Sequence, residues 1–316
     1  MRRGGPPMLA VDPASVPPFA AVERGPRGLR FAPAPAPAGA ADPAGAPLRV
    51  RAAAPAALRQ AAVVAEGALV LGAAEGVAYS LAAPQMHVVH DRRPPGLDRV
   101  VGAAGANAGL LHGEGGWRAV VLPSLGDLAA DLGAGPVAMR ADGRRFAVAH
   151  ESGVDEYEPG IDRAVAFHEG PPVALCYAAD GALLVASGAG VGSPGLAPVA
   201  GSPVVELAAA AAAPRVAARH EDGSVTVWEV GAAEPLAAWA SPVEGAGANA
   251  LSADGALVTL GTPGGEPVAA VASAVDGAQV RRIAGARVIA PGPAPDTYLV
   301  AGDWGSAWME PLEEDR

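Results

Sequence analysis

The sequence predicts an all-β fold made of short strands, and three observations support this prediction. Short runs of Val, Leu and Ala recur along the 316 residues, separated by Gly or Pro. Asp-Gly pairs join several of these runs, and such pairs supply the positive φ angles of a tight two-residue hairpin turn. Prolines every few residues weigh against helices in the Ala-rich stretches, although Ala has the highest helix propensity.

The turn residues recur at a regular interval. Gly143 and Gly181, each preceded by Asp, lie 38 residues apart, and Gly255 of a third Asp-Gly pair follows 74 residues later, which is two periods of 37. Aromatic residues late in each unit run in phase with these turns and comprise Tyr79, Trp117, Tyr157, Trp228 and Trp308. A repeat of about 40 residues that contains four short strands is typical of a β-propeller blade.

Counting these units predicts a single seven-bladed β-propeller with four-stranded blades. The units begin near Ala56, Arg99, Pro136, Pro172, Pro203, Ala248 and Ala286. In the unit from Pro172 the fourth strand is expected at residues 196–200. The last unit has too few residues for a fourth strand, so we expect an N-terminal strand, at residues 48–52 or 28–32, to close the ring and remove an open sheet edge.

The same pattern divides the chain into two parts. Residues 48–316 are predicted to form the propeller. Residues 1–47 are rich in Pro and Ala and are predicted to be a partly extended or disordered segment that supplies the closing strand.

Composition and charge restrict the function classes. The net charge of -11 argues against a nucleic-acid partner, because the phosphate backbone favours clustered basic residues. The single cysteine, Cys176, excludes an internal disulfide and is expected to be a buried, inert thiol. Prolines interrupt the N-terminal segment, and later apolar runs are shorter than the roughly 20 residues that cross a bilayer. We therefore expect a cytoplasmic protein that binds no membrane, and the absence of Lys indicates a GC-rich bacterial genome.

Two segments resemble WD repeats. In the stretch from His220 to Val230, Asp222 precedes a turn and Trp228 follows six residues later, as in the third strand of a WD repeat. The stretch from Phe167-His168 to Asp180-Gly181 resembles the Gly-His entry of such a repeat, with Phe167 in place of the Gly. In WD repeats, an Asp, a His, a Ser or Thr, and a Trp can form a hydrogen-bonded set within one blade. The resemblance implies that Asp222 and Trp228 fill two of these roles in one blade and that His168 fills a third in a neighbouring blade.

Three His-carboxylate pairs are candidates for a partner-binding face. Each His ends a second strand of a predicted blade and each Glu follows closely; the pairs are His112 with Glu114, His150 with Glu151, and His220 with Glu221. These turns share one face of a propeller, so one hypothesis is a recognition rim that responds to pH. The other hypothesis is local hydrogen bonding in solvated turns.

Other patterns leave further hypotheses open. The acidic group Glu151, Asp155, Glu156, Glu158 and Asp162 either docks a basic partner or forms a solvated blade edge. His87 and His90 have an H-x-x-H spacing, but residues three apart in a strand face opposite sides, so no metal site is expected. Trp304 falls in a predicted turn of the last unit and is expected to be an exposed contact residue.

These observations favour a non-catalytic protein-interaction scaffold or adaptor without cofactor or metal. The predicted inner strands consist of Ala, Val, Met, Leu and Cys, which offer little chemistry. By analogy with divergent bacterial propellers, the partners are expected in a regulatory or defence assembly that contains an ATPase or kinase. The alternative is a metal-dependent propeller enzyme of the lactonase or sugar-processing type, which needs carboxylates and His in the central channel.

Overall fold

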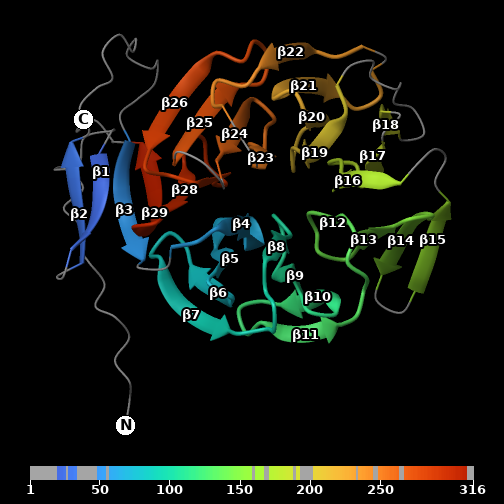
Figure 1. The fold of residues 1–316 in the computed structure, drawn as a ribbon, viewed down its shortest axis with the longest axis horizontal. Coiled ribbons are helices and arrows are strands. Elements are labelled where there is room, and N and C mark those ends of the chain that lie inside the picture. The colour runs from blue at the N-terminus through green and yellow to red at the C-terminus, as the bar shows by residue number, and fades with distance from the viewer. Residues whose placement is uncertain are drawn as a thin grey trace.

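Strands account for almost all of the regular structure in the computed structural model. The structure describes residues 20–25, 28–33, 48–54, 57–158, 161–166, 171–187, 190–192, 202–232, 234–244, 248–262 and 267–311. The main sheets are antiparallel and are arranged around a ring (Figure 1). A short 3-10 turn, η2 (Ala65–Gly67), follows β4 (Gln60–Val64). Among these residues, no helix has the length and apolar character that crossing a membrane requires.

The first three sheets of the ring have four strands each, hydrogen-bonded in chain order. The first sheet comprises β4, β5 (Leu69–Ala74), β6 (Val77–Ala82) and β7 (His87–Arg92). The second comprises β8 (Arg99–Gly102), β9 (Ala108–Gly113), β10 (Gly116–Val121) and β11 (Gly126–Ala129). The third comprises β12 (Val137–Met139), β13 (Phe146–His150), β14 (Gly153–Glu158) and β15 (Ile161–Ala166).

The remaining sheets of the ring continue this order. A three-stranded sheet comprises β16 (Pro172–Tyr177), β17 (Leu183–Ser187) and β18 (Gly190–Gly192). The next sheets comprise β19 (Val204–Ala209), β20 (Arg215–His220), β21 (Ser224–Glu229) and β22 (Ala237–Ala240), and then β23 (Ala248–Leu251), β24 (Leu257–Gly261), β25 (Val268–Ser273) and β26 (Gln279–Ala284). The last sheet comprises β27 (Val288–Pro291), β28 (Tyr298–Gly302), β29 (Gly305–Pro311) and β3 (Leu48–Ala54).

An N-terminal strand completes the last sheet. β3 pairs antiparallel with β29, with Ala53 opposite Ala307. Residues 48–52, one of the two segments expected to close the ring, lie within this strand. Residues 28–32 lie instead in β2 (Gly28–Pro33), which pairs with β1 (Ala20–Gly25) in a separate two-stranded sheet. Contact between β27 and β4 brings the last and first sheets together.

The predicted count of seven blades is wrong. Four hydrogen-bonded strands make a complete blade, and the described residues contain six such sheets. The unit predicted from Pro172 forms the three-stranded sheet β16–β18, and its expected fourth strand at residues 196–200 lies outside the described residues. A sequence period counts units of chain and does not guarantee four paired strands in each unit.

The Asp-Gly pairs form longer turns than the sequence predicts. Gly143, Gly181 and Gly255 have positive φ angles of 67°, 85° and 68°. The Asp before each of these Gly residues has no positive φ. Its carboxylate instead closes the turn by accepting the backbone N–H two residues later, as between Asp180 and Ala182 at 2.9 Å. The expected two-residue turn is therefore wrong, and the loops are built around this side-chain hydrogen bond.

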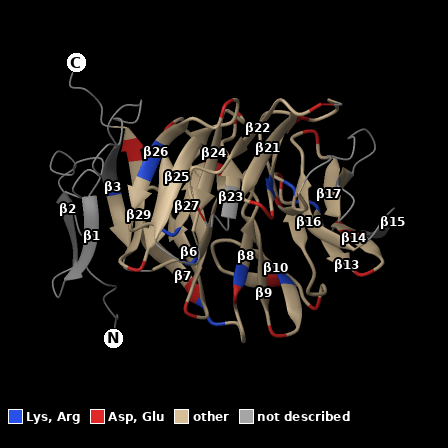
Figure 2. Ribbon diagram, turned by 45° about the horizontal axis from the view of Figure 1, so that its top comes forward, with Lys and Arg blue, Asp and Glu red and all other residues tan. Residues whose placement is uncertain are grey.

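The core lies between neighbouring sheets and consists mainly of small side chains. Ala, Val and Leu make up most of the buried clusters. The predicted aromatic markers all fall in third strands, namely Tyr79 in β6, Trp117 in β10, Tyr157 in β14, Trp228 in β21 and Trp308 in β29. Cys176 is buried, as expected, and burial raises the pKa of its thiol to about 12. Charged residues lie mainly in loops and near strand ends, as Figure 2 shows.

Candidate functional site

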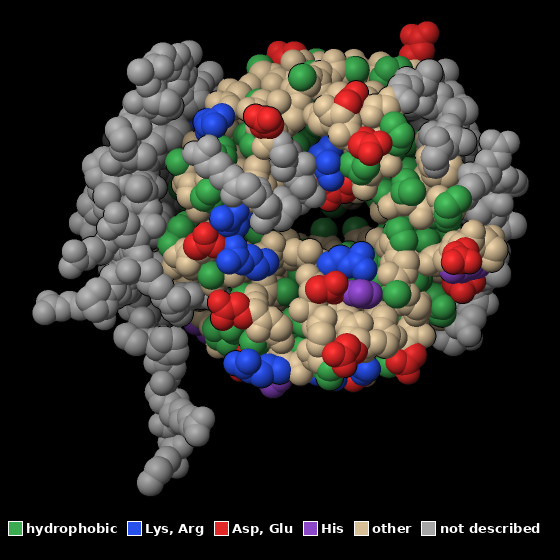
Figure 3. All heavy atoms as spheres, viewed as in Figure 1, with side chains coloured by type: hydrophobic (Ala, Val, Ile, Leu, Met, Phe, Trp, Pro, Cys, Tyr) green, Lys and Arg blue, Asp and Glu red, His purple; other side chains and the backbone are tan. Residues whose placement is uncertain are grey.

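A groove opens on the face of the ring where second strands turn into third strands. Because the strands of each sheet are antiparallel, the connections between successive sheets reach this same face. The groove has a volume of about 700 Å³ and is lined by the connection from β11 to β12, by the ends of β13 and β14, and by the start of β16. Figure 3 shows this face, with acidic, basic and histidine side chains beside a central opening.

The loop from Asp131 to Pro136 forms one wall of the groove. Asp131 and Gly133 adopt φ angles of 60° and 87°, a left-handed conformation that Asp and Gly tolerate better than most residues. Gly135 must lack a side chain, because a Cβ there would lie 2.0 Å from the carbonyl oxygen of Ala149. Leu132 anchors the loop, since its side chain packs in a buried cluster with Trp117 and Val148.

Trp117 in β10 supports this loop from behind. Its indole Nε1 donates to the carbonyl oxygen of Gly135 at 2.8 Å, and its backbone N–H donates to Gly133 at 2.8 Å. The indole ring is 1% exposed. The carbonyl oxygens of Gly133 and Gly135 are therefore hydrogen-bonded to a residue of the second sheet.

His112 lies beside Trp117. Its Nδ1 is 2.5 Å from Asp98 Oδ1 and its Nε2 is 3.3 Å from Arg99 Nη2. Since guanidinium is only a donor, Nε2 accepts and Nδ1 carries the proton that His112 donates to Asp98. The imidazole and indole centroids are 4.9 Å apart, and the Arg99 guanidinium lies 5.1 Å from the Trp117 centroid. This cluster is a scaffold for the loop, because Arg99 also approaches the Ala134 carbonyl oxygen at 3.4 Å.

The predicted partner of His112 is not the observed one. Glu114 is exposed, and its backbone N–H donates to the carbonyl oxygen of Pro95. Asp98 takes the expected place of Glu114 because β8 pairs with β9 so that Arg99 stands opposite His112. The sequence places Asp98 next to the start of a predicted unit, but it does not show which residue of β9 lies opposite this position.

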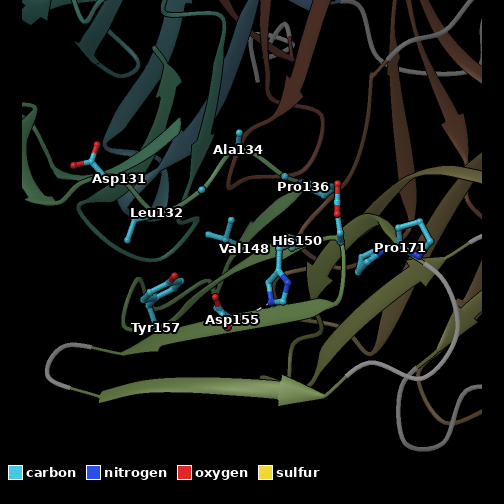
Figure 4. A pocket seen from close by; sticks show the side chains of 14 residues that line it. Asp131, Leu132, Ala134, Pro136, Val148, His150, Asp155, Tyr157 and Pro171 are labelled. Carbon is cyan, nitrogen blue, oxygen red and sulfur yellow. Dashed lines mark ion pairs between the residues drawn. The ribbon is translucent and has the colours of Figure 1, made fainter. Parts of the chain in front are cut away.

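His150 and Asp155 lie within the groove. They come from the adjacent strands β13 and β14, and His150 Nε2 is 3.6 Å from Asp155 Oδ1 (Figure 4). The other ring nitrogen, Nδ1, accepts the backbone N–H of Ser152 at 3.3 Å. Glu151 is exposed and also lines the groove. The second predicted pair therefore contributes to the groove, with Asp155 as the nearer carboxylate.

The acidic group predicted around these residues divides in the structure. Glu156 is 8% exposed and accepts the Tyr177 hydroxyl at 2.8 Å, which links β14 to β16. Glu158 pairs with Arg145 at 2.7 Å. The side chain of Asp162 lies outside the described residues. Among the members of this group whose side chains the structure describes, Asp155 and Glu151 line the groove, and Asp131, which the sequence did not single out, also belongs to the lining.

The third predicted pair lies at a turn on this face, between β20 and β21, but neither residue lines the groove. His220 is 3% exposed, with Nδ1 2.6 Å from the Ser202 carbonyl oxygen and Nε2 2.9 Å from Thr226 Oγ1. Glu221 is exposed and its backbone N–H donates to the Pro203 carbonyl oxygen. His220 is therefore a buried structural residue, and the local hydrogen-bonding hypothesis describes it better than the recognition rim.

Trp304 is not the exposed contact residue that the sequence predicts. It is 7% exposed, and its Nε1 donates to the Gly285 carbonyl oxygen at 2.9 Å. The turn folds back against the connection from β26 to β27, and Gly302 leaves space for the indole, since a Cβ there would lie 2.6 Å from Nε1. The sequence places Trp304 in a turn correctly but does not show that the turn is covered.

The residues of the WD resemblance have separate roles here. Asp222 accepts the Ser224 hydroxyl at 2.6 Å and the Ser224 N–H at 2.9 Å in a turn, and these hydrogen bonds lower the pKa of Asp222. Trp228 is buried in a cluster between sheets. His168 lies outside the described residues.

The H-x-x-H pair lies on one face of its strand, against the expectation. A β-bulge in the pairing of β6 with β7 places His87 opposite Ala82 and His90 opposite Ser80. Ser80 and Ala82 share a face of β6, so His87 and His90 share a face too. Within the described part of the chain, no group of three or more His, Cys, Asp or Glu residues is placed to hold a metal ion.

Comparisons with known proteins support the architecture. No family model and no curated protein matches the sequence. Among solved structures, the β-propeller domain of Cps50 (Swd1) from Myceliophteria thermophila superimposes with a TM-score of 0.65. The match covers 82% of this chain and 98% of that chain. The fold is a β-propeller. At 13% sequence identity, the likeness shows the fold alone.

Proposed function

We propose that this β-propeller is a non-catalytic protein-interaction scaffold and that a protein partner docks in the groove between the second, third and fourth sheets. The observation that carries the proposal is the groove itself. Its volume of about 700 Å³ lies within the range of roughly 300–1,000 Å³ that is typical of pockets for small molecules, so it can hold side chains of a partner segment.

The construction of the groove supports binding to a preformed surface. Trp117 holds Gly133 and Gly135 by two hydrogen bonds of 2.8 Å, so one wall is fixed to a buried side chain. The opposite wall consists of strand residues in β13 and β14. A surface that is ordered before binding loses less conformational entropy when the partner docks.

The scaffold proposal is favoured over the metal-dependent enzyme. That alternative needs several carboxylate and His ligands in one place, and the described residues contain no such group. The expected ATPase- or kinase-containing bacterial assembly stays a hypothesis, because no contact in the structure selects that class of partner.

A substitution that fills the groove tests the proposal. Ala134 is exposed in the groove wall, so Ala134→Trp adds an indole there without replacing a core residue. Ala211, exposed in the loop between β19 and β20 on the opposite face, gives the matched control Ala211→Trp. We expect affinity capture from an extract of the source organism to recover a partner with the wild type and with Ala211→Trp but not with Ala134→Trp. Equal recovery by all three proteins would contradict docking in the groove.

A further inference from the structure

The charges of the groove lining have a single sign. Glu151 comes from the turn after β13 and Asp155 from β14, so two segments bring carboxylates to the lining. Asp131 in the connection after β11 also belongs to the lining, but its carboxylate is directed away from His150 (Figure 4) and lies near Gly115, where it adds negative charge at the edge of the groove. The groove-lining residues of the described chain include neither Lys nor Arg. The net charge of the whole chain, -11, adds a long-range field of the same sign.

The Arg99 guanidinium contacts the loop of the groove wall but does not belong to the groove lining. Arg99 lies over the Trp117 ring and approaches His112 Nε2 and the Ala134 carbonyl oxygen from behind the loop. It therefore fixes the wall without neutralising the carboxylates in the groove by a direct ion pair. His150 in the lining lies 3.6 Å from Asp155 through Nε2.

The apolar part of the lining lies beside these carboxylates. Leu132 and Val148 are 8% and 3% exposed and belong to one buried cluster, and Tyr157 packs against it. One face of the Tyr157 ring stacks on Phe146 with a centroid distance of 5.1 Å. In Figure 4, Tyr157 and Asp155 lie next to each other beside His150. Apolar surface bordered by carboxylates matches a side chain with an aliphatic stem and a cationic end.

We propose that the groove binds a Lys or Arg side chain of a segment of the partner protein. This inference rests on the proposed function and specifies the chemistry of the partner. The aliphatic stem packs against Ala134, Pro136 and Pro171, the exposed or half-buried apolar residues of the lining. The cation meets Asp155 and Glu151, and Tyr157 offers an aromatic contact to the cation. A cavity of this size also accommodates residues on either side of the cationic one.

Selection from a displayed random library of twelve-residue peptides tests the inference on the purified full-length chain. The groove variant combines Asp131→Asn, Glu151→Gln and Asp155→Asn, which removes charge with little change in shape. The control variant combines Glu75→Gln, Glu234→Gln and Glu244→Gln, three exposed residues outside the groove lining, and changes the net charge by the same amount. Circular dichroism and melting temperature establish that all variants are folded.

We expect the selected peptides to be enriched in Lys or Arg. Replacing that residue in a synthetic peptide, with citrulline for Arg or norleucine for Lys, should weaken binding at least tenfold. The groove variant should weaken binding to a similar extent, whereas the control variant should change it less than threefold.

Two results overturn the inference and are distinguishable. In the first, Ala134→Trp abolishes peptide binding, but the peptides are not enriched in Lys or Arg and bind the groove variant as well as the wild type. This result would overturn the charge inference and leave the scaffold proposal standing. Peptides unaffected by Ala134→Trp, or a selection without any enriched peptide, would overturn both.

Discussion

The indole Nε1 of Trp117 donates a 2.8 Å hydrogen bond to the carbonyl oxygen of Gly135, which connects the third strand of one blade to the loop that leads into the next. The same side chain is a regular sequence marker and a buried core residue. A residue that the repeat requires for packing therefore also fixes a wall of the groove.

Trp117→Phe separates these two roles. Phe retains most of the apolar ring but has no N–H, so the Gly135 oxygen loses its donor. We expect the free energy of unfolding to fall by about 1–2 kcal/mol, whereas Trp117→Ala should cost about 3–5 kcal/mol. Urea denaturation measures both values. A Phe variant as stable as the wild type would show that the hydrogen bond does not hold the loop.

Trp228 tests the sheet-to-sheet core. It is 5% exposed and packs in a cluster shared by the sheets β16–β18 and β19–β22. Trp228→Ala should lower the free energy of unfolding by about 3–5 kcal/mol. Leu128, which is 63% exposed on β11, provides the control, and Leu128→Ala should change stability by less than about 0.5 kcal/mol. A loss below about 1 kcal/mol for Trp228→Ala would place the indole outside the core.

The N-terminal strand is expected to stabilise the ring through its pairing with β29. A chain that begins at Leu48 keeps β3, whereas a chain that begins at residue 57 leaves the edge of β29 unpaired. We predict that the longer of these two chains keeps the denaturation midpoint of the full protein. The shorter chain should unfold at lower urea concentration and associate through the open edge. Equal midpoints and sedimentation for both truncated chains would rule out this role for β3.

Acid should weaken the turn at Asp142. Hydrogen bonds from the Arg140 guanidinium and from the N–H of Arg144 lower the pKa of Asp142 from 3.8 to about 2. Because the folded pKa lies below the ordinary value, the carboxylate stabilises the fold above about pH 4, and this contribution is lost as the pH falls toward 2. Asp142→Asn should therefore destabilise the protein at pH 6 and approach the wild type near pH 2. Denaturation midpoints across this range measure the effect, and a pH-independent difference would exclude the carboxylate charge as its cause.

The sequence predicts the repeated architecture well because its signals are local. The aromatic markers from Tyr79 to Trp308 fall in third strands, because the third strand of each blade packs against the neighbouring sheet in an equivalent position. The blade count fails at the unit from Pro172, where the period continues but the described residues form three strands. Turn geometry also differs, because the Asp carboxylate replaces a second positive φ angle.

The candidate site was only partly predictable because its residues meet through pairing between distant segments. His150 and Glu151 were found from their place at a strand end, whereas Asp131 reaches the groove from the preceding blade. Burial explains the two errors. His220 and Trp304 lie in or next to turns, which are usually exposed, but both are covered and hydrogen-bonded internally.

A crystal structure of the chain with a selected basic peptide tests the central claim most directly. We predict a Lys or Arg side chain in the groove, with its nitrogen within hydrogen-bond distance of the Asp155 carboxylate and its stem against Ala134, Pro136 and Pro171. A peptide bound on the opposite face, along an outer strand, or in the groove with its cationic group directed into solvent would contradict it.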